Sequence, residues 1–160
     1  MAETENSKDL ISVLWSGADI LRSKMDANEY KDYLLGIVFY KYLSDSFLIR
    51  VYDLIYDEKP DSLRNALEAY KEALGDESAE ELKEQIKSEC HYVIEPDLTY
   101  TCFADAARNN SFNREQLQKA FNNIEQSDPL FADLFTDIDL YSNRLGTGDQ
   151  KQSDTISNLI

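Results

Sequence analysis

The feature that most constrains the fold is a long apolar run between Tyr30 and Ile55, which no proline interrupts. Apolar side chains fall on nearly every side of a helix drawn through this run, which is typical of a helix surrounded by other helices. Gly36 costs such a helix about 1 kcal/mol relative to alanine, which is tolerable where a neighbouring helix crosses closely. The pattern continues to Lys59-Pro60, where the proline ends it. We therefore expect one long central helix.

A second pattern precedes this run. Leucine, alanine and methionine recur at steps of three and four residues, which predicts an amphipathic helix from about Ser7 to Lys24. Trp15 adjoins the same apolar stripe. Asp26 followed by Glu29 has the form of a capping box, so the long helix should begin after a very short turn. The two helices are expected to be antiparallel.

Four further helices are expected after Pro60. One spans Ser62 to Leu74 and is closed by Gly75, and a capping box at Ser78 and Glu81 opens another that runs to about Cys90. Asn113 caps the next, which carries Phe121, and Asp128-Pro129 opens one that continues through Phe135. Tyr92-Val93-Ile94 is the one extended stretch, too short to indicate a sheet.

These patterns predict an all-α fold, a compact domain of about six helices plus the start of a linker helix. We expect the helical domain to cover residues 1–146 and a linker to cover residues 147–160. A new apolar face begins at Ile156, and Leu159 and Ile160 continue it, so we expect the chain to be cut at a domain boundary.

The composition indicates a single cytoplasmic domain. No apolar run approaches the roughly 20 residues of a membrane span, and the first residues lack the basic and apolar regions of a signal peptide. The two cysteines, Cys90 and Cys102, are too few for a disulfide framework and are expected to be reduced.

Charge is unevenly distributed along this acidic chain. The formal net charge is -15, but basic and acidic residues balance from Lys8 to Arg50, whereas Asp57 to Asp97 holds 5 basic and 13 acidic residues. A face that meets DNA should therefore come from the first segment. A plain role in solubility is equally consistent with this charge.

Five basic residues are the candidates for contact with DNA or with other subunits. They are Lys24, Lys31, Lys41, Arg50 and Arg144. Phosphate contacts by the first four would give a log-log salt slope near -3.6, at about -0.9 per contact. Tyr30, Tyr33, Tyr40 and Tyr42 alternate with the lysines and have the hydroxyl donors for DNA contacts, but packing in the core is the favoured interpretation.

No catalytic, cofactor-binding or metal-binding residue is predicted in this chain. The Gly146-Thr147-Gly148 turn follows no predicted strand, so it is not a nucleotide loop. The prolines stand alone, so the Asn/Asp-Pro-Pro-aromatic turn that holds a flipped base is missing from the sequence. Cys90, His91 and Cys102 lack the spacing of a zinc site or a catalytic pair.

Three separated stretches resemble the N-terminal helical domain of type I restriction-modification DNA methyltransferase subunits. The most specific has Glu29-Tyr30-Lys31, then Leu35-Gly36, then Tyr42-Leu43-Ser44-Asp45 on one predicted helix, after Leu14-Trp15, Ala18-Asp19, Leu21-Arg22 and Asp26. The others are Tyr92-Val93-Ile94 before Pro96, and Leu134-Phe135 with Asp137, Ile138-Asp139, Ser142-Asn143 and Arg144-Leu145-Gly146.

The resemblance implies a catalytic domain beyond residue 160. In that family a Rossmann-like domain binds S-adenosylmethionine and methylates adenine N6 in a bipartite DNA target. The implied partners are a specificity subunit, a second methyltransferase subunit and a restriction subunit, with DNA bound by the assembled complex. We expect this chain to be a non-catalytic assembly and DNA-clamp domain; the alternative is a free-standing acidic helical adaptor or a DNA mimic.

Overall fold

The computed structural model describes residues 12, 15–22 and 24–160, and those that form regular structure are helical. Residues 15–22 form one helix, so the end of the first predicted helix is confirmed, whereas its predicted start at Ser7 lies outside the described residues. The later elements are α2 (Ala27–Tyr56), α3 (Leu63–Leu74), α4 (Ala79–Cys90), η1 (Pro96–Leu98), α5 (Tyr100–Arg108), α6 (Arg114–Ser127), η2 (Pro129–Phe131), η3 (Asn143–Leu145) and α7 (Asp149–Leu159). The predicted all-α class is confirmed.

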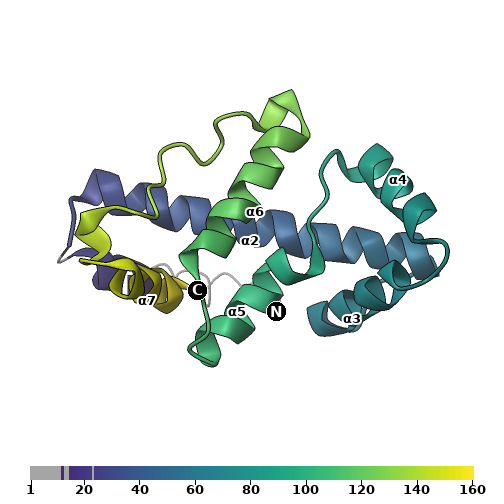
Figure 1. Cartoon of the computed structure of the whole chain (residues 1–160), viewed down its shortest axis with the longest axis horizontal. Coiled ribbons are helices and arrows are strands. Elements are labelled where there is room, and N and C mark those ends of the chain that lie inside the picture. Colours follow the sequence, from purple (N-terminus) through teal and green to yellow (C-terminus); the bar gives the residue numbers. More distant parts are fainter. Residues whose placement is uncertain (1–11, 13–14, 23) are drawn as a thin grey trace.

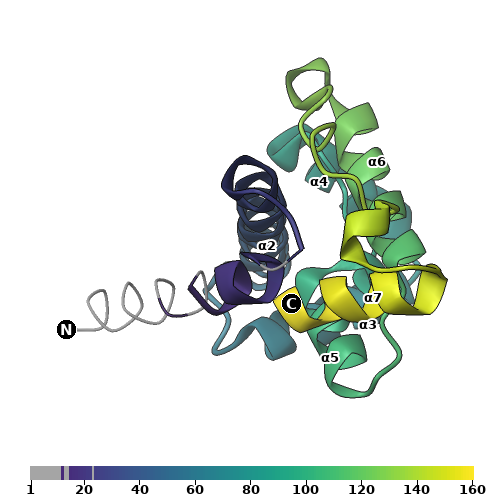
Figure 2. The same ribbon diagram turned by 90° about the vertical axis from the view of Figure 1, so that its left-hand side faces the viewer.

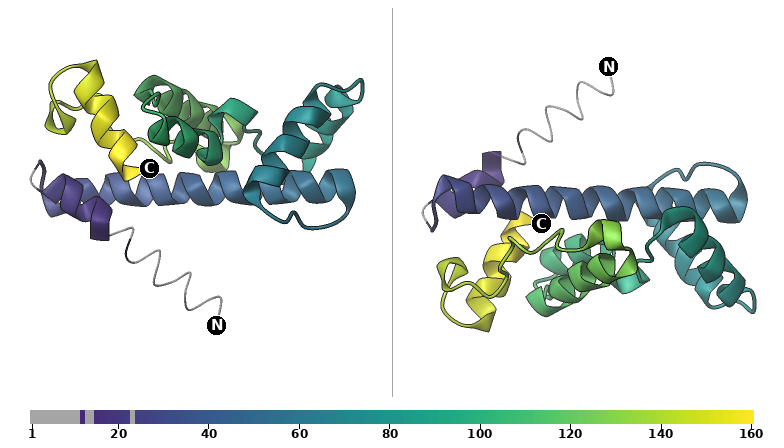
Figure 3. Two further views of the ribbon diagram at one scale, coloured as in Figure 1. Left: turned by 90° about the horizontal axis from the view of Figure 1, so that it is seen from below. Right: turned by 90° about the horizontal axis from the view of Figure 1, so that it is seen from above.

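Helix α2 runs the length of the molecule as a single rod (Figure 1). It packs against α3, α4 and α5, with α3 and α4 grouped at its C-terminal end. Viewed along its axis, α2 stands to one side of the other labelled helices, and residues 15–22 lie below it (Figure 2). The two views of Figure 3 show α3 to α7 along one side of the rod, whereas residues 15–22 lie on the other side of it near its N-terminal end.

An aromatic cluster joins α2 to the later helices. Tyr40 of α2 meets the edge of the Phe121 ring at 5.5 Å between centroids, and Phe121 stacks on Phe135 at 4.1 Å. Phe103 of α5 packs against Tyr40 at 6.0 Å. All four are buried, so three helices and the loop after η2 share one core. Aromatic pairs in these geometries add roughly 0.5–1.5 kcal/mol each beyond the burial of their area.

Tyrosine hydroxyls hold the segment between α4 and α5 in place. The Tyr70 hydroxyl donates to the carbonyl of Ile94 at 2.9 Å, the Tyr92 hydroxyl donates to the carbonyl of Leu43 at 2.9 Å, and the Tyr40 hydroxyl donates to the carbonyl of Leu98. Buried carbonyls need such partners. The extended stretch at residues 92–94 is therefore bonded to the Tyr70 side chain of α3 and, through the Tyr92 hydroxyl, to the main chain of α2, and it forms no strand.

Most helix boundaries match the sequence patterns, but two predicted capping boxes do not form. Neither Asp26 nor Ser78 has a side-chain hydrogen bond to the start of its helix, and Glu29 instead pairs with Arg144. Ser62 and Asn113 do cap α3 and α6, accepting from Asn65 N and Glu115 N.

Gly75 closes α3 as expected, since it is the C-cap residue after Leu74, and its φ is -85°. One other helix is shorter than expected. The helix expected from Asp128 through Phe135 is only the short η2, because the chain turns at Ala132 and has positive φ at Asp133.

Helix α5 is an element that the sequence patterns missed. Its N-cap Thr99 accepts from Cys102 N at 3.4 Å and donates to the carbonyl of Pro96 at 2.8 Å. The Tyr100 amide donates to the buried Ser44 hydroxyl of α2 at 2.8 Å. Phe103 is its one fully buried side chain, which leaves little apolar periodicity to detect.

Helix α7 packs against α5 and α6, and its side chains Ile156 and Leu159 are buried. The buried guanidinium of Arg114 on α6 donates to Gln152 of α7 and lies over the Tyr141 ring at 4.2 Å. The predicted division at residue 146 stays a prediction; in this structure residues 149–159 are part of the packed helices.

Candidate functional site

A row of large apolar side chains runs along the open side of α2. Leu35, Tyr42, Ile49 and Tyr56 follow one another at steps of seven residues, and their side chains are 54%, 65%, 41% and 50% exposed. Seven residues are just under two helical turns, so the four lie in one line with a drift of about 20° per step. Phe39 adjoins the line, 38% exposed and 6.4 Å from the Tyr42 ring. We call these five residues the α2 row.

The α2 row corrects one expectation from the sequence. The apolar residues on every side of α2 predicted a helix enclosed by others, but among the described residues the side chains of the row stay between 38% and 65% exposed. Gly36 does make the close approach that was predicted, although its neighbour is the loop residue Ile138 and not a helix. An exposed apolar patch with polar surroundings marks a protein contact surface more often than a solvated face.

Three of the five candidate cations are held by carboxylates of the same chain. Arg50 contacts Glu89 Oε2 at 2.6 Å and Asp53 Oδ2 at 3.0 Å, Lys41 pairs with Asp45, and Arg144 pairs with Glu29. The Glu89 carboxylate raises the pKa of Arg50 further above its ordinary value. These pairs are exposed and individually weak, but DNA phosphates would have to compete with them.

The remaining two candidates, Lys24 and Lys31, are exposed and lie near the N-terminal end of α2. The positions on α2 also separate the candidates from one another. Arg50 follows Lys41 by about two and a half helical turns, so these side chains leave opposite sides of the helix. The described residues thus hold no single patch made from all five candidates. Their contact with DNA stays a prediction.

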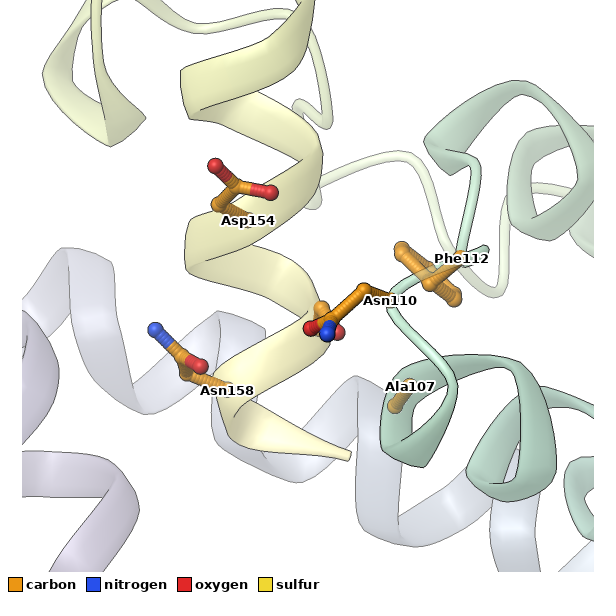
Figure 4. Close-up of a pocket in the computed structure, with 6 residues that line it drawn as sticks. Ala107, Asn110, Phe112, Asp154 and Asn158 are labelled. Atoms are coloured by element: carbon orange, nitrogen blue, oxygen red, sulfur yellow. The ribbon is translucent and has the colours of Figure 1, made fainter.

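A surface pocket of about 340 Å³ lies between the turn after α5 and helix α7 (Figure 4). Its lining is mostly polar: Ala107, Asn110, Phe112, Asp154, Ser157 and Asn158. Asn110 adopts a left-handed backbone with φ 56°, which asparagine tolerates better than most residues. The polar groups of this lining include the Asp154 carboxylate and the Ser157 hydroxyl.

Another pocket, of about 210 Å³, lies where the N-terminal end of α2 meets the loop before α7. Four carboxylates line it, from Glu29, Asp32, Asp137 and Asp139, together with the paired Arg144. The buried Tyr33 hydroxyl donates to the Asp139 carbonyl at 2.5 Å, and burial raises the Tyr33 pKa. This pocket favours cations and repels phosphate.

The cysteines and His91 come from different parts of the fold: Cys90 ends α4 and is followed by His91, and Cys102 lies on α5. Burial raises the pKa of the Cys90 thiol, which disfavours the reactive thiolate. His91 is exposed at the left-handed end of α4, with Nδ1 4.0 Å from Asp128. Within the part of the chain that the structure describes, no three histidine, cysteine or acidic side chains gather as a metal site. No helix in that part is long and apolar enough to span a membrane.

Comparison with known proteins gives consistent matches. The model of the HsdM N-terminal domain family matches residues 10–160. The chain is 26% identical over 156 residues to the type I restriction enzyme MpnII methylase subunit of Mycoplasma pneumoniae, which covers 90% of this chain and 28% of that protein.

A solved structure agrees in fold. The crystal structure of the type I restriction-modification system methyltransferase subunit from Streptococcus thermophilus superposes with a TM-score of 0.86 at 48% identity, over 96% of this chain and 32% of that one. The chain therefore spans about a third or less of the length of the proteins it matches. The resemblance predicted from the sequence motifs is confirmed: this chain belongs to the HsdM N-terminal domain family of type I methyltransferase subunits.

Proposed function

We propose that this chain is the assembly module of a type I methyltransferase subunit and that it works through protein contacts. The observation that carries the proposal is the α2 row, which exposes five large apolar side chains along one side of the longest helix. Exposure of such a row to water is unfavourable, and its burial against a second protein lowers the free energy of the complex. The family supplies the setting, a multi-subunit restriction-modification complex.

The charges of the chain favour this protein-contact role over a direct grip on DNA. A body of net charge -15 repels a polyanion, and three of the five candidate cations already pair with carboxylates. DNA is then bound by the assembled complex, where this domain helps to close the clamp. Lys24 and Lys31 are the residues best placed to add a contact there.

The proposal for the whole protein follows from its relatives. A Rossmann-like domain outside this chain binds S-adenosylmethionine and methylates adenine N6, and the partners are a specificity subunit, a second methyltransferase subunit and a restriction subunit. The complex works in the cytoplasm. The alternative of a free-standing acidic adaptor or DNA mimic is not favoured, because the family match extends over residues 10–160.

A competition experiment tests the assembly role. Excess isolated chain is added to the full-length methyltransferase and specificity subunits of the same system before they assemble, and transfer of labelled methyl groups to target DNA is measured. We expect the chain to lower methylation by occupying contacts that assembly needs. The Tyr42→Glu chain should inhibit less, whereas Leu130→Glu, which changes an exposed residue outside the row, should inhibit as the unmodified chain does.

Full methylation in the presence of excess chain would contradict the assembly role. Equal inhibition when the chain is added after assembly would also contradict it, because the chain would then act on DNA or on the active complex.

A further inference from the structure

We propose that the turn at η2 docks a partner protein whose surface has an apolar hollow bordered by lysine and arginine side chains. This inference rests on the proposed assembly function and names a contact surface apart from the α2 row. Four exposed apolar residues form the surface, and we call them the η2 tip: Pro129, Leu130, Ala132 and Leu134. The Leu130 side chain is 85% exposed, more than any other large apolar side chain in the described part of the chain.

Contacts on the inner side of the turn hold Leu130 in position. The Asp128 side chain accepts from the Leu130 amide at 2.9 Å, and the Asp128 carbonyl accepts from the Phe131 amide at 2.9 Å. The Phe131 ring packs edge-to-face with the Tyr92 ring at 5.6 Å between centroids. Leu130 is therefore fixed by its neighbours before any partner binds. A preorganised contact residue loses little conformational entropy on binding, which favours affinity.

The far end of the turn is fixed as well. Asp133 has φ 61°, a left-handed conformation that is unfavourable for residues other than glycine, although aspartate and asparagine tolerate it best. The Phe135 amide donates to Glu125 Oε1 at 2.9 Å, and the Phe135 ring is buried. Helix α6 and the core thus hold the chain in a turn that exposes two leucines. Exposure of these side chains to water adds nothing to the stability of the fold, whereas a partner that buried them would gain from it.

Acidic side chains border the η2 tip and determine the charge of its partner. Residues 125–139 contain five acidic residues and no basic one: Glu125, Asp128, Asp133, Asp137 and Asp139. Within the described residues, none of the five pairs with a lysine or an arginine, and Asp128 lies 4.0 Å from His91 Nδ1. Lysine and arginine side chains of a partner would therefore meet carboxylates that have no such cation from this chain.

Charge also decides which kind of molecule can bind here. DNA phosphates and anionic lipid headgroups would be repelled by these carboxylates. A basic protein surface is attracted by the same carboxylates, which speeds its association and adds specificity. Its apolar hollow would bury Leu130 at the centre of the contact, with the ion pairs around it. An apolar centre with a polar rim is the usual arrangement of a protein interface.

The η2 tip can be tested separately from the α2 row. The end of α6 that leads into η2 is at the top of Figures 1 and 2, at the edge of the molecule. The restriction subunit of the same system is the probe, because the methylation experiment above contains only methyltransferase and specificity subunits. These two subunits are assembled at full length, and binding of the restriction subunit to the complex is measured by biolayer interferometry.

Leu130→Glu in the full-length methyltransferase subunit should weaken binding of the restriction subunit by about tenfold or more, as expected for the loss of an anchoring side chain. The added carboxylate by itself suits a basic surface, so a loss of affinity reports the missing apolar contact. Gln126→Glu is the matched control, because it adds the same charge at an exposed position of α6 and leaves Leu130 in place. Its affinity should equal or exceed that of the unmodified complex. Unchanged methylation by both variants checks that each folds and assembles.

The carboxylates around the tip give a second readout. The affinity should fall as salt rises from about 50 to about 200 mM, since salt screens exposed charge pairs. The double variant Asp133→Asn, Asp137→Asn should bind more weakly at low salt and should depend less on salt. Asparagine tolerates the left-handed backbone at residue 133, so the turn should be retained.

Three results would overturn the inference: no binding of the restriction subunit at either salt concentration, equal binding by the Leu130→Glu complex, or an affinity that salt does not lower. A Leu130→Glu chain that no longer inhibits in the methylation competition would also overturn it, because the tip would then belong to the methylating complex. The assembly function would still stand in that case. It fails instead if the unmodified chain does not inhibit methylation, whatever the restriction subunit binds.

Discussion

Gly36 shows how one missing side chain fixes the path of a loop. A Cβ at this position would lie 1.7 Å from Cδ1 of the buried Ile138. Alanine gains about 1 kcal/mol of helix propensity, but overpacking typically costs 1–3 kcal/mol. Gly36→Ala should therefore lower the free energy of unfolding by about 1 kcal/mol, measured by urea denaturation.

The double variant Gly36→Ala, Ile138→Val tests whether the loss of stability in Gly36→Ala comes from contact between the new Cβ and Ile138 Cδ1. Valine lacks Cδ1, so the valine substitution should cost about 0.5–1.5 kcal/mol alone and almost nothing when Gly36→Ala is already present. Additive losses in the double variant would show that the two residues do not compete for space.

The buried tyrosines predict how the protein responds to alkali. Burial raises the pKa of Tyr100 to about 12 and raises the pKa values of Tyr40, Tyr70 and Tyr92 further above the ordinary value of 10. An unfolded chain ionises these groups near pH 10, so their contribution to stability is complete below pH 10 and is lost above it. We expect the free energy of unfolding to fall steadily from pH 10 to pH 12.

Absorbance at 295 nm reports tyrosinate directly. Tyr40, Tyr70, Tyr92 and Tyr100 should ionise only together with unfolding, as circular dichroism reports the loss of the helices. If these four tyrosines ionised near pH 10 with the helices intact, the hydroxyl contacts to Ile94 and Leu43 would be ruled out.

At the scale of elements, α3 and α4 offer a matched comparison of helix caps, because each has 12 residues and a serine in the N-cap position. The Ser62 hydroxyl accepts from Asn65 N at 3.1 Å, whereas Ser78 makes no such bond. Ser62→Ala should therefore destabilise the protein by about 1 kcal/mol and Ser78→Ala by close to zero. Thermal unfolding of the two variants checks this, and equal losses would show that Ser78 does cap its helix.

The sequence predicted the helices whose apolar periodicity is strong and whose caps follow local rules. α2, α3 and α6 follow the expected bounds closely, because the pattern of each is set by residues within the element. α5 was missed because its contacts are long-range. Its first amide bonds Ser44, which lies 56 residues earlier, and only Phe103 reaches the core fully.

The prediction that other helices surround α2 was also wrong. Apolar periodicity shows which faces of a helix are apolar, but it does not show which other elements cover those faces. Local sequence makes every face of α2 apolar, yet within the described part of the chain the side chains of the α2 row remain exposed. The seven-residue spacing of Leu35, Tyr42, Ile49 and Tyr56 was a usable signal for the row, since such a repeat is typical of helix pairing.

At the scale of the whole molecule, the sequence motifs identified the family but did not show which basic side chains pair with carboxylates of the same chain. Glu89 reaches Arg50 across 39 residues of sequence, and Glu29 reaches Arg144 from the far end of the chain. No local pattern predicts such ion pairs. The uneven distribution of charge is visible in the sequence. Its place in the molecule is not, because it depends on α3 and α4 lying together at one end of α2.

The central claim is that this domain acts through protein contacts and not by holding DNA phosphates. The most direct measurement is the affinity of the isolated chain for labelled duplex DNA, by fluorescence anisotropy, as salt rises from about 50 to about 200 mM. We predict binding too weak to measure, or a log-log slope no steeper than about -1.8, the value for two contacts by Lys24 and Lys31. A slope near -3.6 that falls with each substitution of Lys24, Lys31, Lys41 and Arg50 by alanine would contradict the account.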